Sequence, residues 1–113
     1  MSSIRKPELF RLLYRKGKHA GGRTLVLYAM PNGKREPRLG ITISRKNGNS
    51  VVRHRFMRIV REVFRTEREA LANDADYMVV MKRDVRILHA RELRFSEIRQ
   101  ELLPLLKRIK GII

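Results

Sequence analysis

The chain of 113 residues contains no cysteine, no tryptophan and few acidic residues. Without cysteine it can form neither a disulfide framework nor a thiolate metal site, which fits a reducing compartment. It also lacks tryptophan and a lipidation signal, two common features of proteins that bind membrane surfaces. The apolar stretch that follows Met1–Lys6 is broken by Arg11 and is too short for a signal peptide or a membrane span. We therefore expect a soluble, cytoplasmic protein with no membrane partner.

The spacings typical of a catalytic or metal site are missing as well. The histidines His19, His54 and His89 are far apart and show no metal-ligand spacing. Ser50 and His54 are one helical turn apart, but arginines crowd them and no carboxylate is placed to orient the histidine. The segment Gly21–Arg23 lacks the context and the ending of a phosphate-binding loop. We expect no catalytic residue and no bound metal in the protein itself.

Positive charge is what the chain has in excess. It carries 27 Lys and Arg against 11 Asp and Glu, a formal net charge of +16. A small domain with this charge repels itself unless a polyanion neutralises it, and nucleic acid is the commonest such partner. The hydrophobic content of 42% argues against a disordered basic tail. We expect one folded domain over residues 1–113 that binds nucleic acid.

The charge is concentrated between Arg45 and Arg68, where eight Lys and Arg stand against two Glu. Gly48 supplies a turn, and Asn49 or Ser50 can cap a helix that we expect to reach about Leu71. At about 100° per residue, this helix has one apolar and one basic face. The apolar face carries Val52, Phe56, Ile59, Val60, Val63 and Ala70. The basic face carries His54, Arg58, Arg61, Arg65 and Arg68, with Arg53 and Arg55 at its flanks. We expect Glu62 and Glu69 to pair with Arg58 and Arg65.

Five further elements complete the prediction. Pro7 and Gly17 suit the two ends of a helix over residues 7–16. Alternating apolar residues predict strands over 24–30 and 38–44, which we expect to pair antiparallel, and a buried strand over 76–82. Ser96 can cap a last helix that reaches Lys110, with a kink at Pro104. The order helix, strand, strand, helix, strand, helix predicts a single-domain α+β sandwich.

The first two strands each have two different faces. The aliphatic face carries Leu25, Leu27, Leu39, Ile41 and Ile43. The other face is smaller, more polar or aromatic and carries Val26, Tyr28, Thr42 and Ser44. Phe10 and Tyr14 share one face of the first helix. Two interpretations of Phe10, Tyr14 and Tyr28 stay open: these rings are part of the core, or they are partly exposed beside a groove.

Residues 46–65, KNGNSVVRHRFMRIVREVFR, resemble the signature of the bacterial ribonuclease P protein subunit. That pattern is a basic residue, Gly-Asn-Ala-Val, Arg-Asn-Arg and then further basic residues. The resemblance extends over nearly the whole chain in the same order. It includes Phe10, Tyr14 and Lys16-Gly17 in the first helix, and the strand segments 26–28, 39–44 and 76–80.

The chain departs from the family pattern at three places. His54 stands at the middle of the Arg-Asn-Arg signature and brings a titratable side chain where the family has a neutral amide. Met57 stands where a second basic residue is common. The strand after Val80 continues into Met81–Asp84 without the usual proline. The leading basic arm is also short, with Arg5 and Lys6 as its remnant.

The resemblance implies a fold similar to the second domain of ribosomal protein S5, with a left-handed β-α-β crossover. It implies 5′ maturation of precursor tRNA, in which a large catalytic RNA performs the Mg²⁺-dependent hydrolysis and the protein binds that RNA and the 5′ leader. The residues expected to bind the catalytic RNA are Arg45, Lys46, Asn49, Arg53, His54, Arg55, Arg58, Arg61, Arg65 and Arg68. The residues expected to line the leader groove are Phe10, Tyr14, Val26, Tyr28, Thr42 and Ser44.

Three other functions fit parts of the sequence. A structural RNA-binding protein of the ribosomal type shares the charge, but it does not explain the string at residues 48–55. A DNA-binding regulator could use the basic helix, yet no helix-turn-helix spacing accompanies it. A protein-only nuclease is least favoured, because the catalytic residues are missing. We therefore expect the protein subunit of ribonuclease P.

Overall fold

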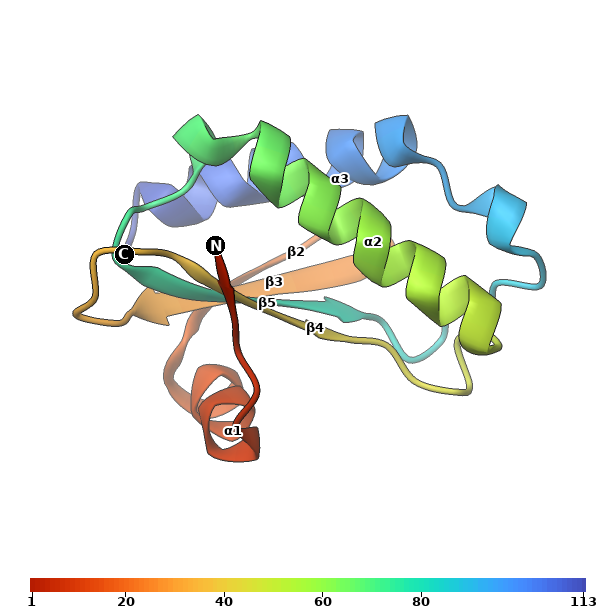
Figure 1. Ribbon diagram of the computed structural model, residues 1–113, viewed down its shortest axis with the longest axis horizontal. Helices are drawn as coiled ribbons and strands as arrows, with labels where there is room; N and C mark the ends of the chain where they lie inside the picture. The colour runs from red at the N-terminus through yellow and green to blue at the C-terminus, as the bar shows by residue number, and fades with distance from the viewer.

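The computed structural model describes residues 1–113 and contains one five-stranded mixed sheet with helices on both faces (Figure 1). The strands are β1 (Ser2–Ser3), β2 (Lys18–Gly21), β3 (Leu25–Pro31), β4 (Arg38–Thr42) and β5 (Ala75–Met81). The helices are α1 (Pro7–Lys16), α2 (Ser50–Thr66) and α3 (Phe95–Lys110), with 3₁₀ turns at Arg68–Ala70 and Ala90–Glu92. The predicted α+β class is confirmed. No helix combines the length and the apolar character needed to cross a membrane.

The order of the strands corrects one prediction. The sheet order is β1-β4-β5-β3-β2, so β3 and β4 are not neighbours and do not form the expected antiparallel pair. Instead β5 lies between them, antiparallel to β3 and parallel to β4. All but one of the residues of β5 are buried, and a strand that is covered on both faces belongs at the centre of a sheet. Alternation in β3 and β4 predicts their faces, but it does not predict their neighbours.

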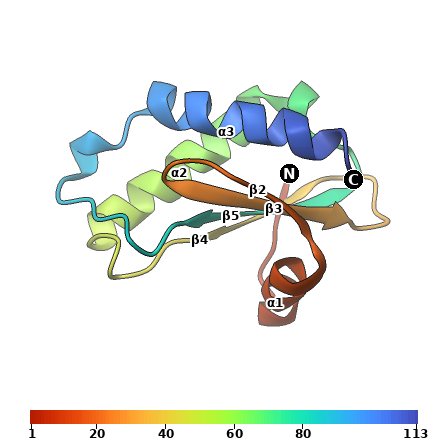
Figure 2. The same ribbon diagram turned by 180° about the vertical axis from the view of Figure 1, so that it is seen from behind.

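The crossover connection from β4 to β5 is left-handed, as the family resemblance implies. The chain leaves β4, returns through α2 above the sheet, and enters β5 behind β4 (Figure 1). Parallel crossovers are right-handed in about 98% of cases, so the resemblance predicted this feature and general rules did not. Figure 2 shows the opposite side, where the β2–β3 hairpin lies in front, α3 lies above it and α1 lies below.

Helix α2 buries the face that its periodicity predicts. Its buried residues are Val52, Phe56, Ile59, Val60, Val63 and Phe64. They pack with the β3 residues Leu25 and Leu27, and with α3, in the main core. The helix ends at Thr66 and not near Leu71, so Ala70 lies in the following 3₁₀ turn and is only half-buried.

Helix α3 begins one residue before the predicted cap. Phe95 is its first residue, the N-cap position is Arg94, and no side chain caps the helix, so the prediction for Ser96 is wrong. The helix continues through Pro104 to Lys110. Pro104 and Gln100, the residue whose carbonyl loses its helical partner there, are both exposed. Water can therefore hydrate the free carbonyl.

Two short strands were not predicted from the sequence. β1 has two residues and pairs in parallel with the start of β4, and β2 has four residues and forms an antiparallel hairpin with β3. Neither segment is long enough to show the alternation on which a strand prediction depends. Together they extend the sheet on both sides, so β4 has a paired outer edge only at its first two residues.

Candidate nucleic-acid interface

Helix α2 presents a row of basic side chains to solvent along most of its length. His54, Arg55, Arg58, Arg61 and Arg65 are all exposed, and Arg53 is half-buried. The row continues into the next turn through Arg68, which lies past the helix end and not on the helix as predicted. Arg45 and Lys46 are exposed in the turn that precedes the helix. The structure therefore brings the predicted basic residues together on one side of the molecule.

Most of this row has no acidic partner. Neither Arg58 nor Arg61 forms an ion pair, and the Nε of Arg55 donates to the backbone oxygen of Leu93 at 2.8 Å. The exception is Arg65, whose guanidinium donates twice to Glu62, with a shortest separation of 2.5 Å. These hydrogen bonds, more than the charge itself, lower the pKa of Glu62 and raise that of Arg65. The predicted pairing of Glu62 with Arg58 and of Glu69 with a row arginine is wrong, which leaves Arg58 free.

The start of α2 is held by two asparagines with different roles. Asn49 is the N-cap, and its side-chain oxygen accepts a hydrogen bond from the backbone N–H of Val52 at 2.9 Å. That oxygen is therefore occupied within the protein. Asn47, which the sequence analysis did not single out, is 2% exposed. Its side chain is the only buried amide in the loop, and it joins this loop to the turn after β5 (residues 82–85).

Each polar atom of the Asn47 side chain has partners. The Oδ1 atom accepts from the backbone N–H of Ser44 at 3.0 Å and from its hydroxyl at 3.1 Å. The Nδ2 atom donates to the backbone oxygens of Lys82 at 2.9 Å and Val85 at 2.8 Å. The Asn47 carbonyl also accepts from the N–H of Ile87 at 2.7 Å. Asn47 therefore fixes where α2 begins relative to the sheet.

The second predicted surface is the sheet face that carries α1. Phe10 lies directly on Gly40, where an added Cβ would stand 2.6 Å from the ring, so any larger residue at this position would have to displace the ring. Two residues beyond Gly40 on β4, the strand register aligns Thr42 with Val80 of β5 and Val26 of β3. All three are half-buried. Val26 and Thr42 therefore share one face of the sheet, as their alternation predicted, and Val80 is an additional member of that face.

The aromatic residues on this face form a partly exposed cluster. Tyr14 is 49% exposed, and its ring lies edge-on to Tyr28 with centroids 4.9 Å apart. His19 on β2 extends the cluster, with its ring centroid 5.8 Å from that of Tyr28. Burial raises the pKa of the Tyr14 hydroxyl, and the neighbouring Tyr28 acts in the same direction while Arg83 opposes it. Tyr14 is thus not a core residue, and the groove interpretation is the one that its exposure favours.

Ser44 differs from the other predicted groove residues. It lies beyond the end of β4, and its hydroxyl donates to Asn47. It is therefore part of the support of the α2 loop. His19 was overlooked because an isolated histidine in a four-residue strand carries no pattern that places it beside Tyr28.

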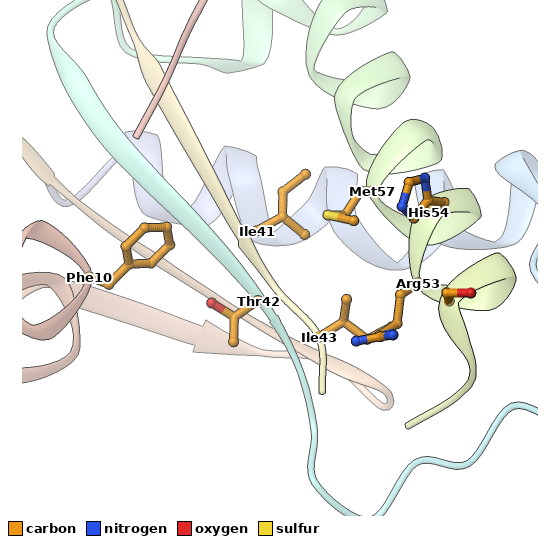
Figure 3. Close-up of a pocket in the computed structure, with 8 residues that line it drawn as sticks. Phe10, Ile41, Thr42, Ile43, Arg53, His54 and Met57 are labelled. Atoms are coloured by element: carbon orange, nitrogen blue, oxygen red, sulfur yellow. The ribbon is translucent and has the colours of Figure 1, made fainter. Parts of the chain in front are cut away.

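A cavity of about 380 Å³ lies where the two surfaces meet, at the outer edge of β4. Figure 3 shows Phe10 on one side of the strand, Arg53, His54 and Met57 of α2 on the other, and Ile41, Thr42 and Ile43 along the strand itself. The cavity therefore joins the basic helix to the α1 face. A second cavity lies between the row residues Arg61, Arg65 and Arg68 and the N-terminal residues 1–3.

No cluster of three or more His, Cys, Asp or Glu side chains is arranged to hold a metal ion. Asp76 is buried, and both its oxygens accept hydrogen bonds of 2.7 Å from Arg38. The Asn32 side chain donates to one of them at 2.9 Å. Asp76 is therefore a structural residue that ties β5 to β4 and to the loop after β3.

Comparisons with known proteins agree with this geometry. The sequence model of the family described as ribonuclease P matches residues 1–110. The chain is 35% identical over 108 residues to the "Ribonuclease P protein component" of Shouchella clausii, covering 95% of this chain and 84% of that protein. It is 36% identical over 111 residues to the protein of the same name from Maridesulfovibrio salexigens, covering 96% and 86%.

Solved structures give the same result. The ribonuclease P protein from Thermotoga maritima superposes with a TM-score of 0.81 at 30% identity, covering 96% of this chain and 98% of that one. The ribonuclease P protein from Staphylococcus aureus also gives a TM-score of 0.81, at 29% identity, with 97% and 96% covered. On the strength of its sequence, its fold and the basic surface that it presents, the chain belongs to the ribonuclease P protein family.

Proposed function

We propose that this chain is the protein subunit of a cytoplasmic ribonucleoprotein in which a catalytic RNA removes the 5′ leader of precursor tRNA. The protein contributes binding surfaces, and the RNA holds the Mg²⁺ ions and performs the hydrolysis. The observation that carries this proposal is the basic row of α2. Arg58 and Arg61 are exposed and unpaired on a helix whose opposite face is buried in the core.

The row can bind the catalytic RNA because an RNA backbone carries successive phosphates and the helix carries successive arginines of opposite charge. Guanidinium groups bind phosphate oxygens through two hydrogen bonds at once, and they stay charged at every physiological pH. His54 adds a ring N–H donor beside Arg53 and Arg55. The buried face of α2 holds the helix firmly, so the row is presented without first having to be ordered.

The α1 face suits an unpaired leader. A single strand offers base faces and phosphates, and proteins bind such strands on aromatic rings within a basic groove. Tyr14, Tyr28 and His19 supply adjoining rings, and the row of Val26, Val80 and Thr42 supplies a shallow floor beside them. Mature tRNA has no leader and would leave this face empty.

Substitution of Tyr28 tests the leader surface. We expect Tyr28→Ala to weaken binding of leader-bearing precursor to the holoenzyme by roughly tenfold or more, because stacking is worth about 1–3 kcal/mol per base. Binding of mature tRNA should stay the same. Tyr28→Phe, which keeps the ring, is the matched control and should bind both ligands nearly as the wild type does. Equal losses for precursor and mature tRNA, together with a lower melting temperature, would assign Tyr28 to the core instead.

A structural RNA-binding protein of the ribosomal type is the alternative, since it needs the same charge. The RNA that copurifies with the tagged protein from its own cells separates the two functions. We expect sequencing to recover one folded RNA, hundreds of nucleotides long, that cleaves precursor tRNA on its own in high Mg²⁺. Enrichment of ribosomal RNA in its place would support the alternative.

A further inference from the structure

The outer edge of β4 is open beyond its second residue. β1 pairs only with Arg38 and Leu39, and the last hydrogen bond on this side runs from the N–H of Ile4 to the carbonyl of Leu39. Backbone groups alternate sides along a strand, so Ile41 points its N–H and C=O to the same open side as Leu39. Ile43 follows, and neither its N–H nor its C=O has a hydrogen-bond partner within the protein. The edge thus offers free donors and acceptors.

This edge forms the floor of the 380 Å³ cavity, whose walls differ in character (Figure 3). Phe10 and Met57 give apolar walls on the two sides of the strand. Arg53 gives the rim a positive charge and His54 adds a polar ring, and neither forms an ion pair with an acidic residue. The only hydrogen bond from the Arg53 guanidinium is a long one of 3.5 Å from Nε to the carbonyl of Asn49. The volume lies within the range of about 300–1,000 Å³ found for ligand pockets.

We propose that the open edge of β4 binds one unpaired RNA nucleotide. Its base would lie against Met57 and hydrogen-bond through its Watson–Crick edge to the backbone of Ile43, while its phosphate would contact Arg53. In an extended residue the N–H and C=O point the same way, as do neighbouring donor and acceptor groups on the edge of a base. This inference rests on the proposed function and adds a base-reading subsite to surfaces that otherwise contact phosphates and ring faces.

Met57 gives this subsite its apolar wall on the α2 side. Methionine is flexible and polarisable, so its side chain can pack on the face of a base. An extended protein strand could also use a free edge, but the rim carries the Arg53 guanidinium and no acidic side chain, and it lies on the row proposed for RNA. We therefore assign the edge to a nucleotide.

Chemical probing of the reconstituted holoenzyme tests this proposal. Dimethyl sulfate reports on the Watson–Crick edges of A and C, and a carbodiimide reports on those of G and U. Holoenzyme with precursor tRNA would be compared for the wild type, Ile43→Ala and Ile43→Pro. Both variants lose the isoleucine side chain, but only proline removes the unpaired N–H. Since Ile43 follows the last paired residue of β4, proline leaves the ladder to β5 intact.

We expect one base to be protected by the wild type and Ile43→Ala, and to become roughly five- to tenfold more reactive with Ile43→Pro, as loss of one hydrogen bond implies. Its position in the catalytic RNA or in the leader identifies the source of the nucleotide. Identical reactivities with Ile43→Ala and Ile43→Pro would overturn the proposal. If Ile43→Pro melts well below Ile43→Ala, Met57→Lys on the surface of α2 decides, and an unchanged reactivity at every protected base would then overturn it. Failure of the wild type to protect any base would instead contradict the proposed function.

Discussion

Replacing Arg58 and Arg61 together with alanine should weaken binding of the catalytic RNA about 100-fold or more at moderate salt, since hydrogen bonds to charged groups contribute about 1.5–3 kcal/mol each. Both side chains are exposed, neither has an acidic partner, and the helix beneath them is anchored by its buried face. Their loss should leave the fold intact. The plot of log affinity against log salt should become shallower by roughly 0.7–0.9 for each phosphate that is no longer neutralised by an arginine.

The matched control removes two positive charges elsewhere. Lys107 and Arg108 are exposed on α3, away from the basic row, so Lys107→Ala with Arg108→Ala produces the same net charge. If only the overall charge mattered, both double variants would lose affinity equally. We expect the α3 variant to keep most of its affinity and nearly all of its salt slope. An unchanged slope in the Arg58 and Arg61 variant would mean that these side chains remain solvated in the complex.

Substitution of Asn47 with alanine should lower the free energy of unfolding by about 2–4 kcal/mol, because each buried polar group left without a partner costs about 1–3 kcal/mol. The side-chain amide that this change removes joins Ser44, Lys82 and Val85. The turn after β5 and the start of α2 would then lose their common support. Urea unfolding measures the effect, and the basic row should become less well positioned as a result.

Asn49→Ala is the control for this change, since it is the same substitution two residues away. It removes the exposed side chain that caps α2, and loss of a helix cap lowers the free energy of unfolding by about 1 kcal/mol. Asn47→Asp adds a second comparison, because aspartate keeps the acceptor but turns a carboxylate towards the carbonyls of Lys82 and Val85. We expect the order Asn49→Ala, then Asn47→Ala or Asn47→Asp, in increasing loss of stability. A loss for Asn47→Ala no greater than that for Asn49→Ala would contradict the role assigned to Asn47.

The sequence carried enough information for the helices and for the faces of the strands. The 3.6-residue period of α2 predicted both its buried face and its basic row, because each residue's direction on a helix follows from its position alone. Alternation likewise separated Leu25 and Leu27 from Val26 and Tyr28. Alternation could not predict which strands are neighbours. The place of β5 between β3 and β4 depends on the crossover through α2 and on burial of β5 from both sides.

The sequence likewise predicted only part of the candidate site. The basic residues share one element, so their grouping could be predicted without the fold. Asn47 could not be recognised, because its partners Lys82 and Val85 are 35 and 38 residues away in the sequence. The same holds for His19 beside Tyr28 and for the open edge at Ile43. These features exist only once the sheet has assembled, and the residue types involved carry no distinctive pattern.

Reconstitution with precursor tRNA tests the central claim most directly. The purified protein, freed of RNA, should not cleave a precursor labelled at its 5′ end, with or without Mg²⁺. Addition of the catalytic RNA and Mg²⁺ should give one cut, at the mature 5′ end of the tRNA. The protein should lower the Mg²⁺ concentration that the RNA needs, because its positive surface offsets repulsion between the two RNAs. Cleavage by the protein after complete removal of RNA, or no effect of the protein on the RNA-catalysed reaction, would contradict the account.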